Sequence, residues 1–533
     1  MAATAARGQI VPPPSPMMNL DDGKLLVNLA RSGMNEFIKS RTPADKQTLG
    51  AALKPLTKKH HPASVTLRSS GRLLARSFRA DTNVCRSVLA AALDAMRSSN
   101  LPDRITPSVL AKMTVEVEIH GKPRAVSARE LDASIVQGLT GVTVSRGVLK
   151  ETLLPSTTCG MGLSPDQMRA VCLAKLPGST SASSRNDAWS VFTSRHYVGY
   201  SDGTVVQLYR GKILIPPEAI TEETLGDAAI AAGLFLAGSQ GSDGDYSGQN
   251  RKASISEHLH AAYAMARLAG RDKRKLFSAS VDRALEYAAG FLHADKKQAR
   301  VLSKSSAGRQ TAESPTRATA WLLLAICELP AEPANKELAE KLAAALRQDV
   351  VSVVGPDHGL ATPAQLADWS VALLALRKFL PENRESDKLL APLTRTMRAW
   401  SKSGQTLSPL ILRGLGDSAV LPKWRQIDDS DLPDRRGGFV SSRPEPTAAD
   451  TATAAICLHE AIKSGAAPKE SIPEIRKRIL RARRFCFQLL YRSSEAYWIS
   501  RPEKMIGGVR AKPSAASISL ESCAAAIEAF CLD

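Results

Sequence analysis

The chain has 533 residues, of which 44% are hydrophobic, so two or three domains are expected rather than one core. No window approaches about 18 uninterrupted apolar residues, which argues against a membrane-spanning helix. Residues 1–16 also lack the apolar block of a secretory signal. We therefore expect a soluble, cytoplasmic protein with no membrane partner.

The formal net charge of +19 favours polyanionic partners, because dispersed Lys and Arg release counterions when they bind nucleic acid. The basic residues are spread along the chain, however, and only 5% of residues are aromatic, so stacking platforms for single strands are scarce. A nucleic-acid-associated protein is thus an alternative and not the main expectation. The eight cysteines include no CxxC pair, so we expect no disulfide framework, no metal site and no cofactor.

The first part of the chain predicts an α+β domain over residues 21–178. Residues 1–20 are rich in Ala and Pro without a period and predict a disordered leader. From Asp22 the apolar residues fall on one helical face, and a second amphipathic helix is predicted over 84–98. Strands with period-two alternation are predicted at 64–67 and 113–119.

The order and wording of these elements resemble the AMMECR1-like family over roughly residues 20–178. The segments that carry the resemblance are Lys24–Arg31, Ser64–Leu74, Thr114–Ile119, Gly138–Arg146, Leu153–Pro155 and Met168–Leu176. That family has an Arg-Gly-Cys-Ile-Gly-like turn after its strand, whereas this chain has Leu74-Ala-Arg-Ser-Phe-Arg79, without the Cys or the Gly pair. The resemblance therefore implies a non-catalytic domain in which Arg76 is the residue that carries over, as a candidate binding residue.

A linker and a small β ribbon are predicted next. The stretch Leu176–Asp187 combines Pro, Gly, Ser and Asn without a period, which places a linker at residues 179–190 and a domain boundary there. Over 191–219, an Asp202-Gly203 turn between apolar runs predicts a hairpin.

Helices dominate the rest, residues 220–533, and predict an all-α toroid of about five to six helical hairpins. Glycine-rich turns recur beside helices packed with small residues, at 240–246, 437–439 and 507–509, as an array of hairpins requires. Small-residue helices suit an inner ring, and singly striped helices suit an outer ring. The predicted helices are near 224–239, 254–269, 277–292, 314–329, 335–348, 363–379, 386–402, 406–415, 447–464, 472–491 and 515–531.

This half resembles α/α-toroid proteins of the terpenoid-cyclase, prenyltransferase and six-hairpin type. The resemblance rests on Gln240…Asp243-Gly244, on Glu257–Leu268 followed by Val281–Tyr287, and on Gly437-Gly-Phe439 followed by Asp450–Leu458.

Two chemistries of that superfamily find little support in the residues. Asp428-Asp429-Ser430-Asp431 is similar to an acidic cyclase motif but stands in a charged, Pro-bounded stretch that predicts a solvated loop. Asp450, Cys457 and His459 are the residue types of a prenyltransferase zinc site. On one helix His459 would lie about 160° round from Cys457, which argues against a shared metal.

Carboxylates at the helix starts give a third possibility. Asp245, Glu257 and Glu521 are the candidate catalytic residues, because sugar-acting toroids place carboxylates around the mouth of the inner ring. Tyr246, His258 and His260 are candidate binding residues beside them. Acidic residues also favour helix N-termini through capping and the helix dipole, which is the structural alternative.

Two functions follow from these patterns. The first is a non-catalytic binding or scaffold protein, for a small polar or carbohydrate ligand or a protein partner, since both halves lack the chemical signatures of the families they resemble. The second is a toroid enzyme that acts on a carbohydrate or other polar substrate. Carboxylates gathered on one central cavity would favour the enzyme, and dispersed carboxylates around a plugged centre would favour the scaffold.

Overall fold

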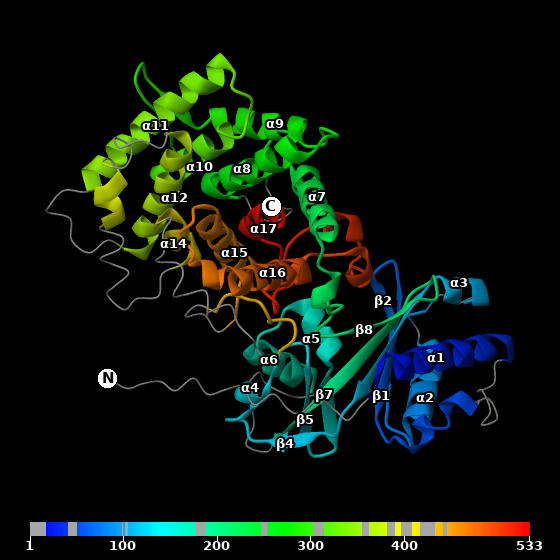
Figure 1. The fold of residues 1–533 in the computed structure, drawn as a ribbon. Helices are drawn as coiled ribbons and strands as arrows, with labels where there is room; N and C mark the ends of the chain where they lie inside the picture. The colour runs from blue at the N-terminus through cyan, green and yellow to red at the C-terminus, as the bar shows by residue number, and fades with distance from the viewer. Residues whose placement is uncertain are drawn as a thin grey trace. The chain divides into compact units, whose positions relative to one another are not determined.

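A computed structural model describes residues 18–40, 51–98, 100–101, 105–176, 187–246, 253–302, 314–353, 362–380, 388, 390–395, 408–415, 432–440 and 445–532. The chain forms two compact units (Figure 1). Unit 1 consists of Met1–Leu214 and Ser493–Pro502, and unit 2 of Ile215–Arg492 and Glu503–Asp533. The chain thus leaves unit 1, returns to it near its carboxyl end, and leaves it again.

Unit 1 is built on an antiparallel sheet with the strand order β2-β1-β3-β7-β5-β6, in which β4 and β8 also pair with β7. The long strand β7 is the hub, because one end pairs with β3 and the other with β5. The strands are β1 Ala63–Ser69, β2 Arg72–Arg79, β3 Thr114–His120, β4 Arg124–Val126, β5 Thr140–Arg146, β6 Leu149–Leu153, β7 Ala188–Gly199 and β8 Val205–Leu208.

Helices α1 (Leu20–Ser40) and α2 (Val84–Met96) cover one face of β1 and β3 (Figure 1). Alternate strand residues such as Val65 and Val117 are fully buried against them, as period-two alternation predicts. Near β5 and β6 the helix α6 (Pro165–Lys175) buries a smaller apolar cluster. The remaining helices of this unit are α3 Pro107–Ala111, α4 Leu131–Ser134 and α5 Pro155–Met161.

The predicted separate ribbon over 191–219 is corrected by this sheet. Most of its first strand lies in β7, which is an interior strand of unit 1. The physical reason is that both ends of this strand are buried in the core of unit 1. Trp189 and Val191 join the core beneath β5, while Tyr197 joins the core beneath α1 and donates its hydroxyl to the carbonyl of Met18 at 3.0 Å.

Unit 2 is a closed ring of helices. The inner helices α8, α10, α12, α14, α15 and α17 contact one another in this order, and α17 contacts α8. Outside this ring, α7 lies against α17 and α8, α11 against α10 and α12, and α16 against α15 and α17, while α9 packs on α8. This is the toroid-like arrangement of inner and outer helices that the small-residue and striped segments predict. Figure 1 shows α17 enclosed by its neighbours.

The helices of unit 2 follow the predicted ranges closely. Their bounds are α7 Glu222–Ser239, α8 Ile255–Arg271, α9 Ser278–Ala289, α10 Pro315–Ile326, α11 Pro333–Val353, α12 Pro363–Phe379, α14 Pro409–Leu415, α15 Ala448–Lys463, α16 Ile472–Leu489 and α17 Leu520–Phe530. A short hairpin of β9 (Leu292–Ala294) and β10 (Ala299–Val301) precedes α10. The predicted helix over 386–402 lies mostly outside the described residues.

The recurring glycine turns perform one structural task three times. Each has a glycine with positive φ in the segment that precedes an inner helix, and a Cβ there would overlap the carbonyl oxygen of an outer helix. The glycines are Gly244 (φ 92°, against Arg283 of α9), Gly437 (φ 85°, against Arg481 of α16) and Gly507 (φ 87°, against Ala231 of α7). The turns therefore fix the approach of inner and outer helices.

A hydrogen bond is repeated with each turn. The residue two positions after the glycine donates its N–H to the side chain at the fourth position of the following inner helix. The pairs are Tyr246 to His258 Nδ1 at 3.3 Å, Phe439 to Thr451 Oγ1 at 2.9 Å and Val509 to Cys523 Sγ at 3.2 Å. His258, Thr451 and Cys523 are thus structural equivalents.

Replacing Gly437 with alanine is expected to lower the free energy of unfolding by more than about 2 kcal/mol. The substitution adds left-handed strain and an overlap with the backbone of α16. Urea denaturation would measure the loss. Gly465→Ala is the matched control, because Gly465 has a similar φ of 71° but open space around its Cβ position. Equal losses in the two variants would contradict the close approach to α16.

Candidate functional site

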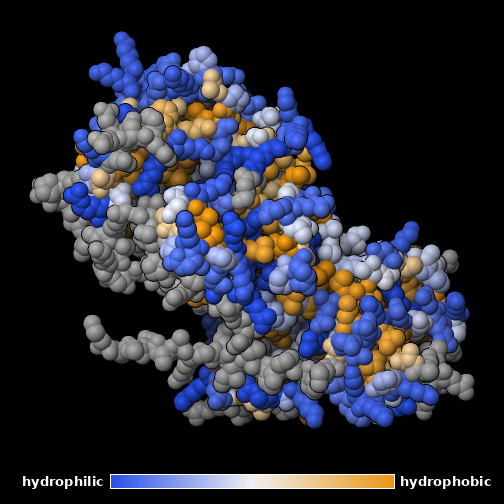
Figure 2. Space-filling view, viewed as in Figure 1, coloured by the Kyte–Doolittle hydropathy of each residue, from blue (hydrophilic) through white to orange (hydrophobic). Residues whose placement is uncertain are grey.

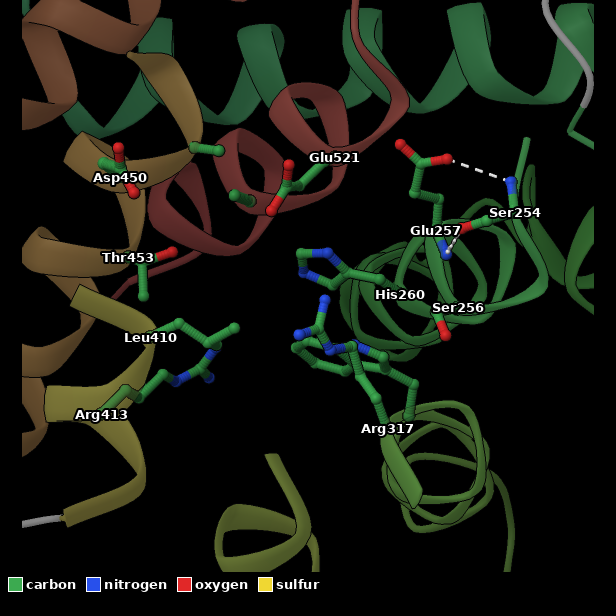
Figure 3. A pocket seen from close by; sticks show the side chains of 13 residues that line it. Ser254, Ser256, Glu257, His260, Arg317, Leu410, Arg413, Asp450, Thr453 and Glu521 are labelled. Atoms are coloured by element: carbon green, nitrogen blue, oxygen red, sulfur yellow. Dashed lines mark hydrogen bonds between the residues drawn. The ribbon is translucent and has the colours of Figure 1, made fainter. Parts of the chain in front are cut away.

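A pocket of about 330 Å³ opens at the amino-terminal end of the inner ring in unit 2 (Figure 3). Its rim is made of side chains from the first turn of several inner helices. Glu257, Arg317 and Asp450 each occupy the third position of their helix, α8, α10 and α15, and Glu521 occupies the second position of α17.

One turn deeper, the same helices supply the walls of the pocket. His260 lies below Glu257, Trp321 below Arg317 and Thr453 below Asp450, because residues three or four apart share a helix face. Arg413 of α14 completes the lower part. The repeated hairpins therefore place two layers of side chains around one axis.

Carboxylates are stabilised at this end of the ring. Helix amino termini carry partial positive charge and offer N–H donors. Glu257 accepts a hydrogen bond from the N–H of Ser254 at 3.0 Å in a capping box, and Asp450 accepts one from the hydroxyl of Thr447 at 2.9 Å. Figure 3 shows Glu521 directed toward the space between these helices.

A buried ion network lies beneath the pocket. Glu528 of α17 is fully buried and accepts hydrogen bonds from His260 Nε2 at 2.9 Å and Arg267 Nη1 at 3.4 Å, and its carboxylate lies 2.9 Å from Arg413 Nη2. Burial alone would raise the pKa of Glu528, but the charge of Arg413, with the hydrogen bond from His260, holds it far below its usual range. Arg413 also reaches Glu460 at 3.3 Å. This network fixes two of the basic residues that face the pocket, His260 and Arg413.

Trp321 is a wall of the pocket and not an open platform. Its ring stacks on the imidazole of His260, with the ring centroids 4.0 Å apart and an angle of 15° between planes, and Tyr263 lies on it at 5.7 Å. Only 3% of Trp321 is exposed. The face that stacks on His260 is therefore already occupied.

The structure brings together only part of the predicted site. Glu257, Glu521 and His260 line the pocket. Asp245, Tyr246 and His258 lie elsewhere, in the turn that precedes α8. For Asp245 this corrects the prediction that it reaches the mouth, because the residue is 5% exposed and lies 3.6 Å from His258 Nδ1.

His258 and Tyr246 hold the glycine turn against its neighbours. His258 Nε2 lies 2.9 Å from the carbonyl oxygen of Ala284, so this nitrogen carries the proton and Nδ1 accepts the N–H of Tyr246. The Tyr246 hydroxyl lies 3.1 Å from that of Ser280. Burial lowers the pKa of His258 to about 4 and raises the pKa of Tyr246 to about 12. Both residues belong to the structural device that Thr451 and Cys523 repeat.

Sequence reasoning missed Arg317, Arg413 and the pocket position of Asp450. The repeated glycine turns contain a sequence signal for the position of Asp450. Glu257 follows Gly244 by 13 residues, and Asp450 follows Gly437 by the same 13 residues. Aligning the turns would have placed both carboxylates at one level of the ring. Arg317 and Arg413 have no such signal, since the residue 13 positions before each of them in the sequence is not a glycine.

The alternative chemistries fare differently. Among the described residues, no group of three His, Cys, Asp or Glu side chains is arranged to hold a metal ion. Cys457 is buried, and this burial raises the pKa of its thiol well above the usual value, which opposes a thiolate nucleophile. Asp428, Asp429 and Asp431 lie outside the described residues.

Helix α16 carries a run of basic residues between Arg476 and Arg484, and part of this run points inward. Arg483 forms an ion pair with Glu222 at 2.8 Å, and Arg484 donates to the carbonyl oxygen of Ile215 at 2.6 Å. Only the first part of the run, with Arg476 and Lys477, is exposed. On the face drawn in Figure 2, hydrophilic residues are spread widely, with hydrophobic patches between them.

Arg76 lies in unit 1, beside a second pocket of about 280 Å³. Its Nε donates to Thr66 Oγ1 at 2.9 Å, and its Nη1 donates to the hydroxyl of Thr157. The predicted binding residue thus borders a cavity, although the Cys and Gly residues of the family turn are absent.

No helix within the described ranges combines the length and the apolar character that a membrane crossing requires.

Two solved structures show a distant likeness to this chain. A scan of protein-family models finds no match, and a search of curated proteins finds none. An uncharacterised protein from Pyrococcus horikoshii matches with 18% identity and a TM-score of 0.33, over 36% of this chain and 98% of that one. A GH76 α-mannanase from Bacteroides thetaiotaomicron matches with 11% identity and a TM-score of 0.37, over 59% and 97%. Neither is close enough to argue an activity, and the AMMECR1-like assignment stays a prediction.

Proposed function

We propose that unit 2 binds a small, neutral, polyhydroxylated ligand of the sugar class in the pocket at the mouth of its inner ring. The observation that carries the proposal is the placement of three carboxylates, from α8, α15 and α17, around one pocket. Carboxylate oxygens accept hydrogen bonds from hydroxyl groups, and their arrangement fixes the orientation of a ligand that donates several.

The charges of the pocket support a neutral ligand. Arg317 already forms an ion pair with Asp368 at 2.6 Å, and Arg413 with Glu528 at 2.9 Å. These cations therefore have acidic partners outside the pocket lining, while still offering N–H donors at its edge. A ligand with hydroxyl groups can donate to the carboxylates and accept from the arginines at the same time. The volume of about 330 Å³ suits a small molecule.

A second candidate, hydrolysis of a glycosidic bond, is favoured by the same carboxylates. Such a reaction needs one carboxyl group as acid and another as base or nucleophile. Glu257 is fixed by Ser254, whereas Glu521 stands exposed at the rim, so the two differ in environment. Sugar binding does not require hydrolysis, because a non-catalytic binding protein would also hold its ligand at the mouth of the toroid.

The proposal is tested by thermal shift and calorimetric titration of the full chain with glucose, mannose, galactose, N-acetylglucosamine and their disaccharides. A bound sugar raises the melting temperature, because it prefers the folded protein. Glu521→Gln is expected to weaken binding by about tenfold or more, since it replaces a charged acceptor with a neutral one. Glu257→Gln has the same purpose and preserves the capping box, in which Gln serves as well as Glu.

The matched control is Glu337→Gln on the exposed surface of α11, for which binding is expected to stay unchanged. Nitrophenyl glycosides of the sugars that bind would test hydrolysis, and product released by the wild type but not by Glu521→Gln would support the enzyme. An amine ligand that binds in place of every sugar would refute the neutral-ligand proposal. So would sugar binding that is equal in wild type and both variants.

A further inference from the structure

The second face of the sheet in unit 1 is polar and buried. On β3, Val115 and Val117 face the apolar core, and the alternating Glu116 and Glu118 face the opposite side with only 2% and 3% exposure. The neighbouring strands continue this polar layer, because Thr66 of β1 lies opposite both Glu116 and Arg76. A Val-Glu alternation ordinarily indicates one face in water, so the burial of these glutamates requires a reason.

The Glu116 carboxylate is stabilised by its neighbours. His196 Nε2 lies 2.9 Å from Glu116 Oε2, and Arg68 forms an ion pair with the other oxygen. Tyr497 donates its hydroxyl to Oε2 at 3.5 Å. Burial alone would raise the pKa of Glu116, but the hydrogen bond and charge of His196, with the charges of Arg68 and Arg76, hold it at about 2. The carboxylate is therefore charged and fully engaged.

Arg76 has a different set of partners. It is half-buried at the edge of the pocket. Among the described residues it bonds Thr66 and Thr157, both neutral, and forms no ion pair. A half-buried guanidinium whose hydrogen bonds go to neutral hydroxyl groups attracts an anion, since the loss of hydration is only partly offset.

The pocket is completed by residues distant in sequence. Tyr497 and Trp498 line it, and they belong to the segment 493–502 that returns to unit 1 between α16 and α17. This segment is held firmly. Glu495 is fully buried and accepts the N–H of Ile213 at 2.9 Å, and the Tyr200 hydroxyl donates to the carbonyl of Ser494.

We propose that this pocket of unit 1 is a binding site for a small anionic ligand, in which Arg76 holds a carboxylate or phosphate group and Trp498 covers the rest of the molecule. The Arg76 guanidinium is planar and presents several N–H donors, a geometry that suits either anion. The Thr157 hydroxyl accepts from Arg76 and so keeps its own proton to donate. The Glu116 carboxylate does not repel the ligand strongly, because Arg68 forms an ion pair with it and His196 lies at hydrogen-bond distance from its other oxygen.

The test measures binding of sodium phosphate and, separately, sodium malonate to the full chain by calorimetry and tryptophan fluorescence, against sodium chloride at equal ionic strength. The wild type is expected to bind at least one anion at millimolar concentration. Arg76→Gln is expected to weaken that binding by about tenfold or more. Preference for phosphate would indicate a phosphate ester as natural ligand, and preference for malonate a carboxylate.

Arg97→Gln is the matched control, because Arg97 lies on the exposed end of α2 in the same unit and is expected to leave binding unchanged. Trp498→Phe provides a second variant should Arg76→Gln fail to fold, and it is expected to abolish the fluorescence change while retaining the calorimetric signal. Binding of neither anion to the wild type would overturn the proposal. So would equal binding to wild type and folded Arg76→Gln, or a fluorescence change that persists in Trp498→Phe.

Discussion

Replacing Glu528 with alanine is expected to lower the free energy of unfolding of unit 2 by about 3–5 kcal/mol, the usual loss when one member of a buried ion network is removed. The substitution removes the buried carboxylate that Arg413 and Arg267 share beneath the pocket. It also removes the acceptor of His260. Urea denaturation of the full chain, with tryptophan fluorescence as the signal, would measure the change.

Two further variants show whether the loss comes from the buried charge. Glu528→Gln keeps the shape and one acceptor oxygen, so its loss should be intermediate. Glu337→Gln removes an exposed carboxylate from a helix surface pair and should change stability by less than about 0.5 kcal/mol. If Glu528→Ala were no more damaging than Glu337→Gln, the network would not stabilise the ring.

Acidification from pH 7 to pH 4 is expected to destabilise unit 2 by about 3 kcal/mol through His258 alone. Burial lowers the pKa of His258 to about 4 in the folded protein, against about 6.5 for an unperturbed histidine. The unfolded chain therefore binds the proton more readily than the folded one. The stability from this residue is complete above about pH 6.5 and is lost as the pH falls toward 4.

His258→Asn should remove this part of the pH dependence, because the amide does not titrate and its oxygen can still accept the N–H of Tyr246. Denaturation at several pH values between 4 and 7 would show a shallower slope than in the wild type. His293→Asn, at an exposed position in β9, should leave the slope unchanged. A wild-type slope in His258→Asn would mean that the histidine is not buried in its neutral form.

The helical half was predictable because local signals and tertiary packing agree there. The helices α7 to α12 begin within a few residues of the predicted starts, and four of them, α7, α8, α10 and α12, are capped by Thr221, Ser254, Ser314 and Thr362. The turn glycines Gly244, Gly437 and Gly507 belong to a motif that repeats in the sequence. Their contact with the carbonyl groups of the outer helices arises only in the assembled ring.

The sites were less predictable, because burial and pairing decide which polar residues face a cavity. Asp245 and Glu257 look alike in sequence, but one lies in the turn and the other at the third position of α8. The sequence pattern predicts that Glu116 and Glu118 face solvent on an amphipathic strand. In the structure, α5 and the segment 493–502 cover them. Burial by segments that are distant in the sequence produces no periodic pattern around the buried residues.

The return of the chain at 493–502 has a consequence for biosynthesis. The ribosome finishes residue 214 well before Tyr497 and Trp498 emerge, and at ~5–20 residues per second the interval is on the order of tens of seconds. During that time the nascent first unit exposes Glu116 and its partners to water. The segment that completes this face of the sheet is synthesised just before the final helix. A chain that terminates before residue 493 therefore lacks the residues that cover Glu116.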